Sequence, residues 1–285
     1  MIEEILIVGL ATSALYLVIA LGLVMVYSVG RVEDLSVGAY LMVAAYIYWF
    51  LAEGGPYLSL PKGAAIIITI LIGSAISISV YRGFIRRLLD NPTAVFISTL
   101  IFSLIVENVL AGIFGEAPRS VHPLVYGSVT IGGITITLNI VIILAIAWAI
   151  TIILITFISK SYIGRAIRAV SINPRGAMLV GIDPEKVRIL TWGLCGALSA
   201  VAGISLATHT SISTGMWILP LILAFIIVMI GGLGSIGGAI LSAHIIGFVG
   251  AFTMVMIDER LRGVFGLLLL LVILIFRRRG LFGRE

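Results

Sequence analysis

The sequence predicts an all-α, polytopic membrane protein with about eight to ten transmembrane helices, some of them broken or re-entrant. Of its 285 residues, 61% are hydrophobic and only 11% are charged, and the mean hydropathy is +1.24. A soluble globular domain carries about 25% charged residues. Apolar runs also recur from one end of the chain to the other. We therefore expect residues 1–285 to form a single transmembrane domain.

Nine apolar runs account for the predicted helices. Several are shorter than the roughly 20 residues needed to cross about 30 Å of hydrocarbon, which is why the expected number of spans is a range. Met1-Ile2-Glu3-Glu4 lacks a basic segment, and no small-residue cleavage site follows, so we expect the first span to be retained. The runs cover residues 5–29, 39–52, 63–81, 94–114, 139–158, 189–209, 217–230, 239–256 and 263–276.

The basic residues predict an orientation, because Lys and Arg concentrate in cytoplasmic loops. With the N-terminus outside and the C-terminus in the cytoplasm, the outer segments hold only Lys62, Arg119, Arg260 and Arg262. The other 14 of the 18 Lys and Arg residues then lie inside. The net charge of +5 thus reflects basic inner loops and does not indicate nucleic-acid binding. The inner segments are 30–38, 82–93, 159–188, 231–238 and the tail from 277.

The outer loop 115–138 differs in its residue pattern from the other connections. β-Branched residues alternate from Val129 to Thr137 around Gly132-Gly133, a pattern that predicts a small hairpin on the outer surface. Two interpretations remain open: a simple connector, or part of a platform for an external partner.

The inner loop 159–188 is the longest polar segment and carries two predicted helix starts. Asn173-Pro174 and Asp183-Pro184 each place a capping side chain before a proline, which suits the first helical position. Gly181 supplies the left-handed residue that ends the first helix, so we expect a short helix from Pro174 to Val180. Its apolar residues either dock on a partner protein or fold back onto the spans. These residues are Met178, Leu179 and Val180.

Two breaks, 30–38 and 231–238, interrupt apolar sequence without forming a proper loop. Broken helices at corresponding places in a transporter point to the translocation path. The glycines of the second break permit close backbone approach or a re-entrant turn. They are Gly231, Gly232, Gly234 and Gly237. A ridge of small residues in span 189–209 predicts close helix packing. It consists of Gly193, Gly196, Ala197, Ala200 and Gly203.

Glu107 is the one clear acid within a span, where a central charge costs at least about 2.5–3.5 kcal/mol. Thr99 and Ser103 precede it by eight and four residues on the same helical face. We expect this stripe, joined by Asn108, to face the protein interior. It is either a strut between helices or a lining of the transport path.

The first break contains two further polar residues that could line the path. They are Asp34 and Ser36, and Asp34 is equally suited to capping the helix that follows.

The remaining sequence argues against an enzyme or a metal site. A single cysteine, Cys195, and three histidines without paired spacing predict neither metal nor cofactor. There is no Ser/His/Asp or paired-carboxylate arrangement, and no GxxxxGK[ST] stretch. Any ATP hydrolysis is therefore expected on a separate chain.

Two motifs closely resemble the branched-chain amino acid ABC importer permeases. The first comprises Gly164-Arg165-Ala166-Ile167-Arg168-Ala169-Val170, Asn173-Pro174 and Leu179-Val180-Gly181-Ile182-Asp183. The second runs from Ala224-Phe225 through Ile230-Gly231-Gly232-Leu233-Gly234-Ser235-Ile236 to Gly238-Ala239. With the spans between them, the resemblance covers nearly the whole chain.

The resemblance implies a multi-pass permease subunit in a prokaryotic cell membrane, within a larger assembly. The expected partners are a second permease, identical or homologous, two ATP-binding cassette ATPases, an extracytoplasmic solute-binding protein and membrane lipid. It places ATPase contact in the inner loop, as a coupling helix with flanking residues. These are Gly164, Arg165, Arg168, Asn173, Pro174, Met178, Leu179, Gly181 and Asp183.

One stretch departs from the pattern of that family. Asp34-Leu35-Ser36-Val37-Gly38 looks more like the related sugar permeases, and Glu107-Asn108 stands where Gln-Asn is usual. Branched-chain or other small amino acids are the expected substrates, with simple sugars, amides or nucleosides as alternatives. A stand-alone ion-coupled transporter is a different interpretation, for which Glu107 is the only clear intramembrane acid. A purely structural scaffold is disfavoured by the broken helices.

Overall fold

The computed structural model describes residues 2–54, 60–131, 134–258, 261–277 and 280–282. Its elements follow in chain order. The first half holds α1 (Ile2–Gly30), α2 (Val37–Glu53), α3 (Lys62–Val80), the π-helix η1 (Tyr81–Ile85), α4 (Arg86–Leu88) and α5 (Pro92–Phe114). A hairpin follows, formed by β1 (Ser128–Ile131) and β2 (Ile134–Thr137). The second half holds α6 (Leu138–Lys160), α7 (Tyr162–Ile172), α8 (Pro174–Leu179), α9 (Pro184–His209), α10 (Ile218–Gly231), α11 (Ile236–Met256) and α12 (Arg262–Phe276).

Each of the nine predicted apolar runs forms a helix. Among the described residues, six helices are long and apolar enough to cross a membrane. One of them runs over 27 residues, from α3 through η1 and α4. Of the several runs predicted to be short, three form the shorter apolar helices α2, α10 and α12. The predicted all-α, polytopic fold class is confirmed.

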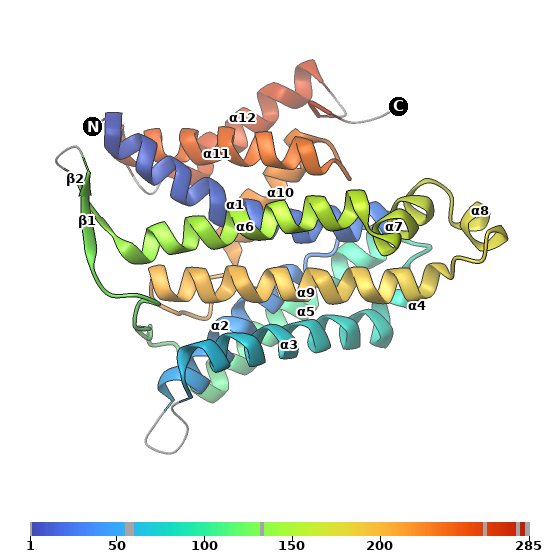
Figure 1. Cartoon of the computed structure of the whole chain (residues 1–285), viewed down its shortest axis with the longest axis horizontal. Helices are drawn as coiled ribbons and strands as arrows, with labels where there is room; N and C mark the ends of the chain where they lie inside the picture. Colours follow the sequence, from blue (N-terminus) through green and yellow to red (C-terminus); the bar gives the residue numbers. More distant parts are fainter. Residues whose placement is uncertain (1, 55–59, 132–133, 259–260, 278–279, 283–285) are drawn as a thin grey trace.

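Two helices, α1 and α9, lie at the centre of the bundle (Figure 1). α9 packs against α1, α2 and α3, while α1 also packs along α11. Within their most apolar windows, 72% of α9 and 61% of α1 is buried, against 22% for both α5 and α6. The outward faces of α5 and α6 are therefore largely available to lipid or to another subunit.

The small-residue ridge of α9 packs closely against α3, as predicted. A Cβ added at Gly196 would lie only 2.4 Å from the carbonyl oxygen of Gly73, so only glycine fits there. The short distance lets Ser77 Oγ donate to the carbonyl of Trp192 at 2.7 Å, and Ser74 Oγ donate to that of Gly193 at 3.0 Å. Small residues and interhelical hydroxyl bonds join the two helices.

The hairpin and α8 lie at opposite ends of the bundle (Figure 1). The hairpin is antiparallel, with Ser128 opposite Thr137, and this confirms the predicted strands. The predicted Gly132-Gly133 turn lies outside the described residues. The adjoining loop is fixed by Asn139, which accepts from the N–H of Leu124 and donates to the carbonyl of Thr208, both at 2.9 Å.

The basic residues are segregated between these two ends. Lys62 and Arg119 lie at the hairpin end of the bundle. Lys62 Nζ donates to the Pro123 carbonyl, and the backbone of Arg119 forms an antiparallel β-bridge with Ile212. Arg260, Arg278, Arg279 and Arg284 fall outside the described residues. The connections at the α8 end carry the larger group, namely Arg31, Arg82, Arg86, Arg87, Lys160, Arg165, Arg168, Arg175, Lys186 and Arg188.

Gly196→Ala tests the close packing of α3 on α9. The added methyl would meet the Gly73 carbonyl and the Ser77 Cβ, at 2.4 and 2.6 Å. We expect a loss of about 1–3 kcal/mol in stability, as for an overpacked core, measured as a lower thermal midpoint in detergent. Gly112→Ala in α5 is the matched control, because nothing lies within 4 Å of the methyl that this change adds. Equal midpoints for the two variants would contradict this packing.

Candidate functional site

The first break, between α1 and α2, is held against α5 by hydrogen bonds to its backbone. Both hydrogen bonds involve the backbone of Leu35. Its N–H donates to Thr99 Oγ1 at 3.1 Å, and its carbonyl accepts from Ser103 Oγ at 3.2 Å. Both hydroxyl side chains are fully buried. Thr99 and Ser103 therefore face the interior, as predicted, and satisfy backbone groups that have left the helix.

Asp34 lies at the centre of this break and is buried. One carboxylate oxygen accepts from the N–H of Ser36 at 2.9 Å and from the Ser36 hydroxyl. The other accepts from Trp192 Nε1 of α9, also at 2.9 Å. The Ser36 and Tyr40 hydroxyl oxygens are 2.7 Å apart. In this conformation Asp34 joins the break to α9, and its carboxylate oxygens both have donors.

Glu107 connects α5 to the start of α10. Its Oε2 accepts from Trp217 Nε1 at 2.9 Å, and the Trp217 ring is buried against Gly38 of α2. The Glu107 side chain itself is half-buried. This contact is the geometry expected of a strut between helices, and it leaves part of the carboxylate surface accessible.

The prediction that Asn108 joins the inward stripe is wrong. Asn108 is exposed, and its amide donates to the Leu104 carbonyl of its own helix at 2.7 Å. Five residues beyond Ser103, it lies about 140° around the helix from that buried hydroxyl, since each residue advances about 100°.

A chain of contacts leads from Asp34 to the inner loop. The ring of Trp192 packs against that of Tyr81, with centroids 4.4 Å apart. The Tyr81 hydroxyl donates to Glu185 Oε2 at 2.9 Å, and Arg86 Nε lies 3.1 Å from Glu185 Oε1. Tyr81 opens the π-helix η1, a distortion that is frequent at functional sites.

Sequence reasoning missed this chain of contacts. Its one visible signal was Glu185, which with Asp183 is one of only two acids in the basic loop 159–188.

The inner loop folds as predicted. Asn173 Oδ1 accepts from the N–H of Gly176 at 3.0 Å, and Asp183 Oδ1 accepts from that of Glu185 at 2.9 Å. Gly181, two residues beyond the end of α8, has φ +80° and terminates the helix. The N–H groups of Gly181 and Ile182 donate back to the carbonyls of Met178 and Ala177, which is the Schellman pattern.

The apolar residues at the tip of α8 do not fold back onto the helices of this chain. The exposed fractions are 55% for Met178, 90% for Leu179 and 73% for Val180. Of the two alternatives for these residues, the fold-back is contradicted.

α7 forms an elbow between α6 and α8. A Cβ at Gly164 would lie 2.3 Å from the carbonyl oxygen of Ile158, so glycine permits the sharp corner. Arg168 Nη1 donates to that same carbonyl at 2.6 Å. Arg165 is exposed and lies over the ring of Tyr162. Arg168 therefore braces the elbow through this carbonyl group, although its side chain, like that of Arg165, is exposed.

The second break is a tight turn between α10 and α11. Gly231 and Gly238 touch backbone to backbone, since a Cβ at Gly238 would lie 2.0 Å from the Gly231 carbonyl oxygen. Gly232 and Gly234 have φ of +94° and +84°, which confirms a glycine-dependent turn with close approach. Gly237 is exposed, with open space around it, and does not take part in the close contact.

Within the described ranges, no group of three His, Cys, Asp or Glu side chains could hold a metal ion.

Trp192→Phe tests the bond between Asp34 and α9. The change keeps most of the ring but removes the indole donor, which should cost about 1–3 kcal/mol of stability, read as a lower thermal midpoint. Trp148→Phe is the control, because Trp148 is half-buried and makes no hydrogen bond within the described part of the chain. Combined with Asp34→Asn, Trp192→Phe should be non-additive by about 0.5–3 kcal/mol. Additive losses would mean that the two side chains do not interact.

Comparisons with known proteins agree along almost the whole chain. The family described as "Branched-chain amino acid transport system / permease component" matches residues 5–275. The chain is 28% identical to the high-affinity branched-chain amino acid transport system permease protein BraD of Pseudomonas aeruginosa, over 97% of this chain and 94% of BraD. It is 30% identical to the probable branched-chain amino acid transport permease protein LivH of Methanocaldococcus jannaschii, over 82% of this chain and 76% of LivH.

A solved structure shares the fold. PsaBC from Streptococcus pneumoniae, determined in complex with Fab, superposes with a TM-score of 0.51, covering 94% of this chain and 90% of that one at 14% identity. At this identity the likeness concerns the fold alone. The full-length family match carries the classification: this chain is a multi-pass inner-membrane permease subunit, not an enzyme, and it belongs to the branched-chain amino acid permease family of ABC transporters.

Proposed function

We propose that the chain forms half of the translocation path for branched-chain or other small amino acids in an ABC importer. The observation that carries this proposal is the family match over residues 5–275. A second permease, identical or homologous, would supply the other half of the path. Two ATPase subunits and an extracytoplasmic binding protein complete the proposed assembly.

The distribution of polar groups supports a path between two subunits. Four of the predicted path residues are buried and form hydrogen bonds within the first break or between the break and α5, so in this conformation they do not face a passage. They are Asp34, Ser36, Thr99 and Ser103. α5 is one of the two least buried spans, and Asn108 with part of Glu107 is accessible on it. A path along the outer face of α5, closed by a second permease, uses these groups.

The proposed orientation places the hairpin outside and α8 in the cytoplasm. The concentration of Lys and Arg at the α8 end supports it, since cytoplasmic connections are rich in both. The hairpin end is then the side on which a binding protein would deliver the solute.

The proposed coupling element is α8. Its exposed tip of Met178, Leu179 and Val180 lies at the cytoplasmic end of the bundle in this orientation. Arg165 and Arg175 are exposed nearby, and they suit acidic groups on a partner. Burial of this apolar tip in a cleft of the ATPase would stabilise the complex.

Solute uptake by the reconstituted importer tests the substrate class. We expect proteoliposomes containing this chain, its partner permease, the ATPases and the binding protein to accumulate leucine when ATP is enclosed. A Walker-motif ATPase variant should abolish that uptake. Fructose should not be accumulated, and preferred fructose uptake would favour the sugar alternative that residues 34–38 suggest. Leucine uptake that persists without ATP would instead favour a secondary transporter.

Leu179→Asp tests the coupling element. Leu179 is 90% exposed, so the change should leave folding and membrane insertion intact. In an apolar cleft the carboxylate would be buried without a partner, which costs several kcal/mol. We expect the ATPase subunits to be lost on co-purification, or their stimulation by loaded binding protein to fall at least about tenfold, which corresponds to 1.4 kcal/mol or more.

Leu179→Met is the size-matched control and should retain ATPase binding. Gly181→Val alters only the cap: its Cβ meets nothing within 4 Å, but φ of +80° disfavours it by about 1 kcal/mol or more. Wild-type coupling in Leu179→Asp would place the docking surface elsewhere.

A further inference from the structure

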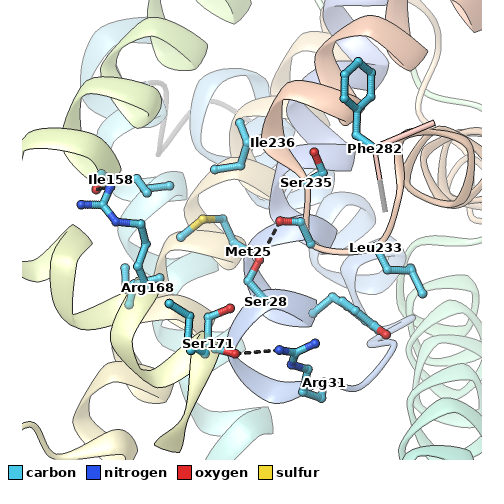
Figure 2. Close-up of a pocket in the computed structure, with 14 residues that line it drawn as sticks. Met25, Ser28, Arg31, Ile158, Arg168, Ser171, Leu233, Ser235, Ile236 and Phe282 are labelled. Atoms are coloured by element: carbon cyan, nitrogen blue, oxygen red, sulfur yellow. Dashed lines mark hydrogen bonds between the residues drawn. The ribbon is translucent and has the colours of Figure 1, made fainter. Parts of the chain in front are cut away.

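A basic cavity of about 520 Å³ lies between the end of α1, α7 and the turn that joins α10 to α11. Figure 2 shows the two arginines that line it, Arg31 from the end of α1 and Arg168 from α7. Ser28 and Ser235 line the side toward α11. The cavity is at the same end of the bundle as α8, and none of the polar groups already assigned to the path lines it.

The charge of this cavity is not compensated by acids. No Asp or Glu is among its lining residues, and neither arginine forms an ion pair in the described part of the chain. Arg31 Nη2 donates to the carbonyl of Ser171 at 2.7 Å, and Arg168 donates to those of Ile158 and Ser159. These carbonyls hold the guanidinium groups at two walls. Since each guanidinium has five N–H donors, most donors stay available for an anion.

The backbone of Arg31 is strained at the point where α1 ends. Arg31 has φ +55°, and within the described ranges it is the one residue other than glycine with positive φ. An L side chain is disfavoured in this region, whereas glycine adopts it without steric cost. The positive φ belongs to the cap of α1, because the N–H of Arg31 donates to the carbonyl of Tyr27 at 2.9 Å, as in the αL motif. Its hydrogen bond to Ser171 is made by an exposed side chain and contributes little alone.

The start of α11 adds donors on the opposite wall. Ser235 caps the helix by accepting from the N–H of Gly238 at 3.1 Å. The N–H groups of Ile236 and Gly237 precede the first intrahelical bond and carry the positive end of the helix dipole. The cavity is thus lined by two guanidinium groups and by a helix start, and such donors suit a phosphate group.

Apolar surface accompanies these donors. Ile172 and Phe282 also line the cavity, with 80% and 52% of their side chains exposed. α7 is amphipathic, burying Ile167 and Val170 and exposing its arginines, as is typical of a helix at the membrane surface. A ligand with a phosphate and an apolar chain matches both parts of the cavity.

We propose that this cavity binds the phosphate of an anionic phospholipid from the leaflet at the α8 end. Arg31 and Arg168 bind the phosphate oxygens, while the acyl chains lie against the exposed side chains of Ile172 and Phe282. Basic pockets between transmembrane helices are known to bind anionic head groups. The bound lipid would brace α1, α7 and the α10–α11 turn together. This inference does not depend on the transported solute.

The test uses the full-length chain, delipidated in detergent and titrated with dioctanoyl phosphatidylglycerol. The readouts are the thermal midpoint and the mass of the intact complex. We expect saturable stabilisation and one bound lipid at concentrations at least about tenfold below those for dioctanoyl phosphatidylcholine, and weaker binding at high salt. Inorganic phosphate is titrated in parallel. Stabilisation by both probes means that phosphate alone suffices, whereas stabilisation by the lipid alone assigns part of the affinity to its chains.

Arg31→Gly is the decisive variant, because glycine relieves the strained φ and the protein should fold at least as well. Its affinity for phosphatidylglycerol should fall about tenfold, as expected for the loss of a charge-assisted bond. Arg168→Gln should weaken binding similarly. Arg165→Gln is the matched control, since Arg165 is exposed on the same helix but does not line the cavity. Equal binding of the two lipids, or wild-type binding by Arg31→Gly, would overturn the proposal.

Discussion

Backbone that leaves a helix inside a membrane protein has no water to bind, so its N–H and C=O groups need partners within the protein. This requirement explains several of the polar side chains buried near the breaks. At the first break, Thr99 and Ser103 satisfy both backbone groups of Leu35, and Asp34 accepts from the next available N–H. At the second break, the carbonyls of Ile230 and Gly231 accept from the N–H groups of Leu281 and Phe282. Asp34, Thr99 and Ser103 are thus first of all partners of broken backbone.

The same partners connect distant elements. Because Trp192 donates to Asp34 and packs on Tyr81, the position of α9 is linked to the first break and to the π-helix η1. Glu185 continues this link to the first turn of α9, two residues after the cap Asp183. Under the proposed function, a force applied at α8 reaches the first break through α9, a rigid helix with buried contacts on three neighbours. Coupling would require that these contacts have a second arrangement.

Sequence reasoning succeeded where the physical signal is local. Asn173, Gly181 and Asp183 act on backbone groups two to five residues away, so their roles in α8 and α9 could be predicted from spacing alone. The nine apolar runs and the hairpin strands are equally local patterns. The Trp192–Asp34 bond spans 158 residues and depends on how α1, α2 and α9 pack. Nothing in the neighbourhood of either residue could have indicated it, and the position of Asn108 was misjudged because adjacent residues on a helix point in different directions.

The energetics of α8 explain why its caps matter more than its length. A helix of six residues is far too short to be stable alone. It is held by the Asn173 cap and the Gly181 motif, each contributing roughly 1 kcal/mol, and by Ala177, which is buried. Burial of a leucine side chain contributes about 1.5–3 kcal/mol, so covering Leu179 alone would yield more than either cap. Small local interactions within the chain thus set the geometry of α8. A larger gain in free energy would come from a partner that covers its exposed apolar residues. A docking element requires both properties: a conformation that is fixed before binding, and apolar surface whose burial by a partner stabilises the complex.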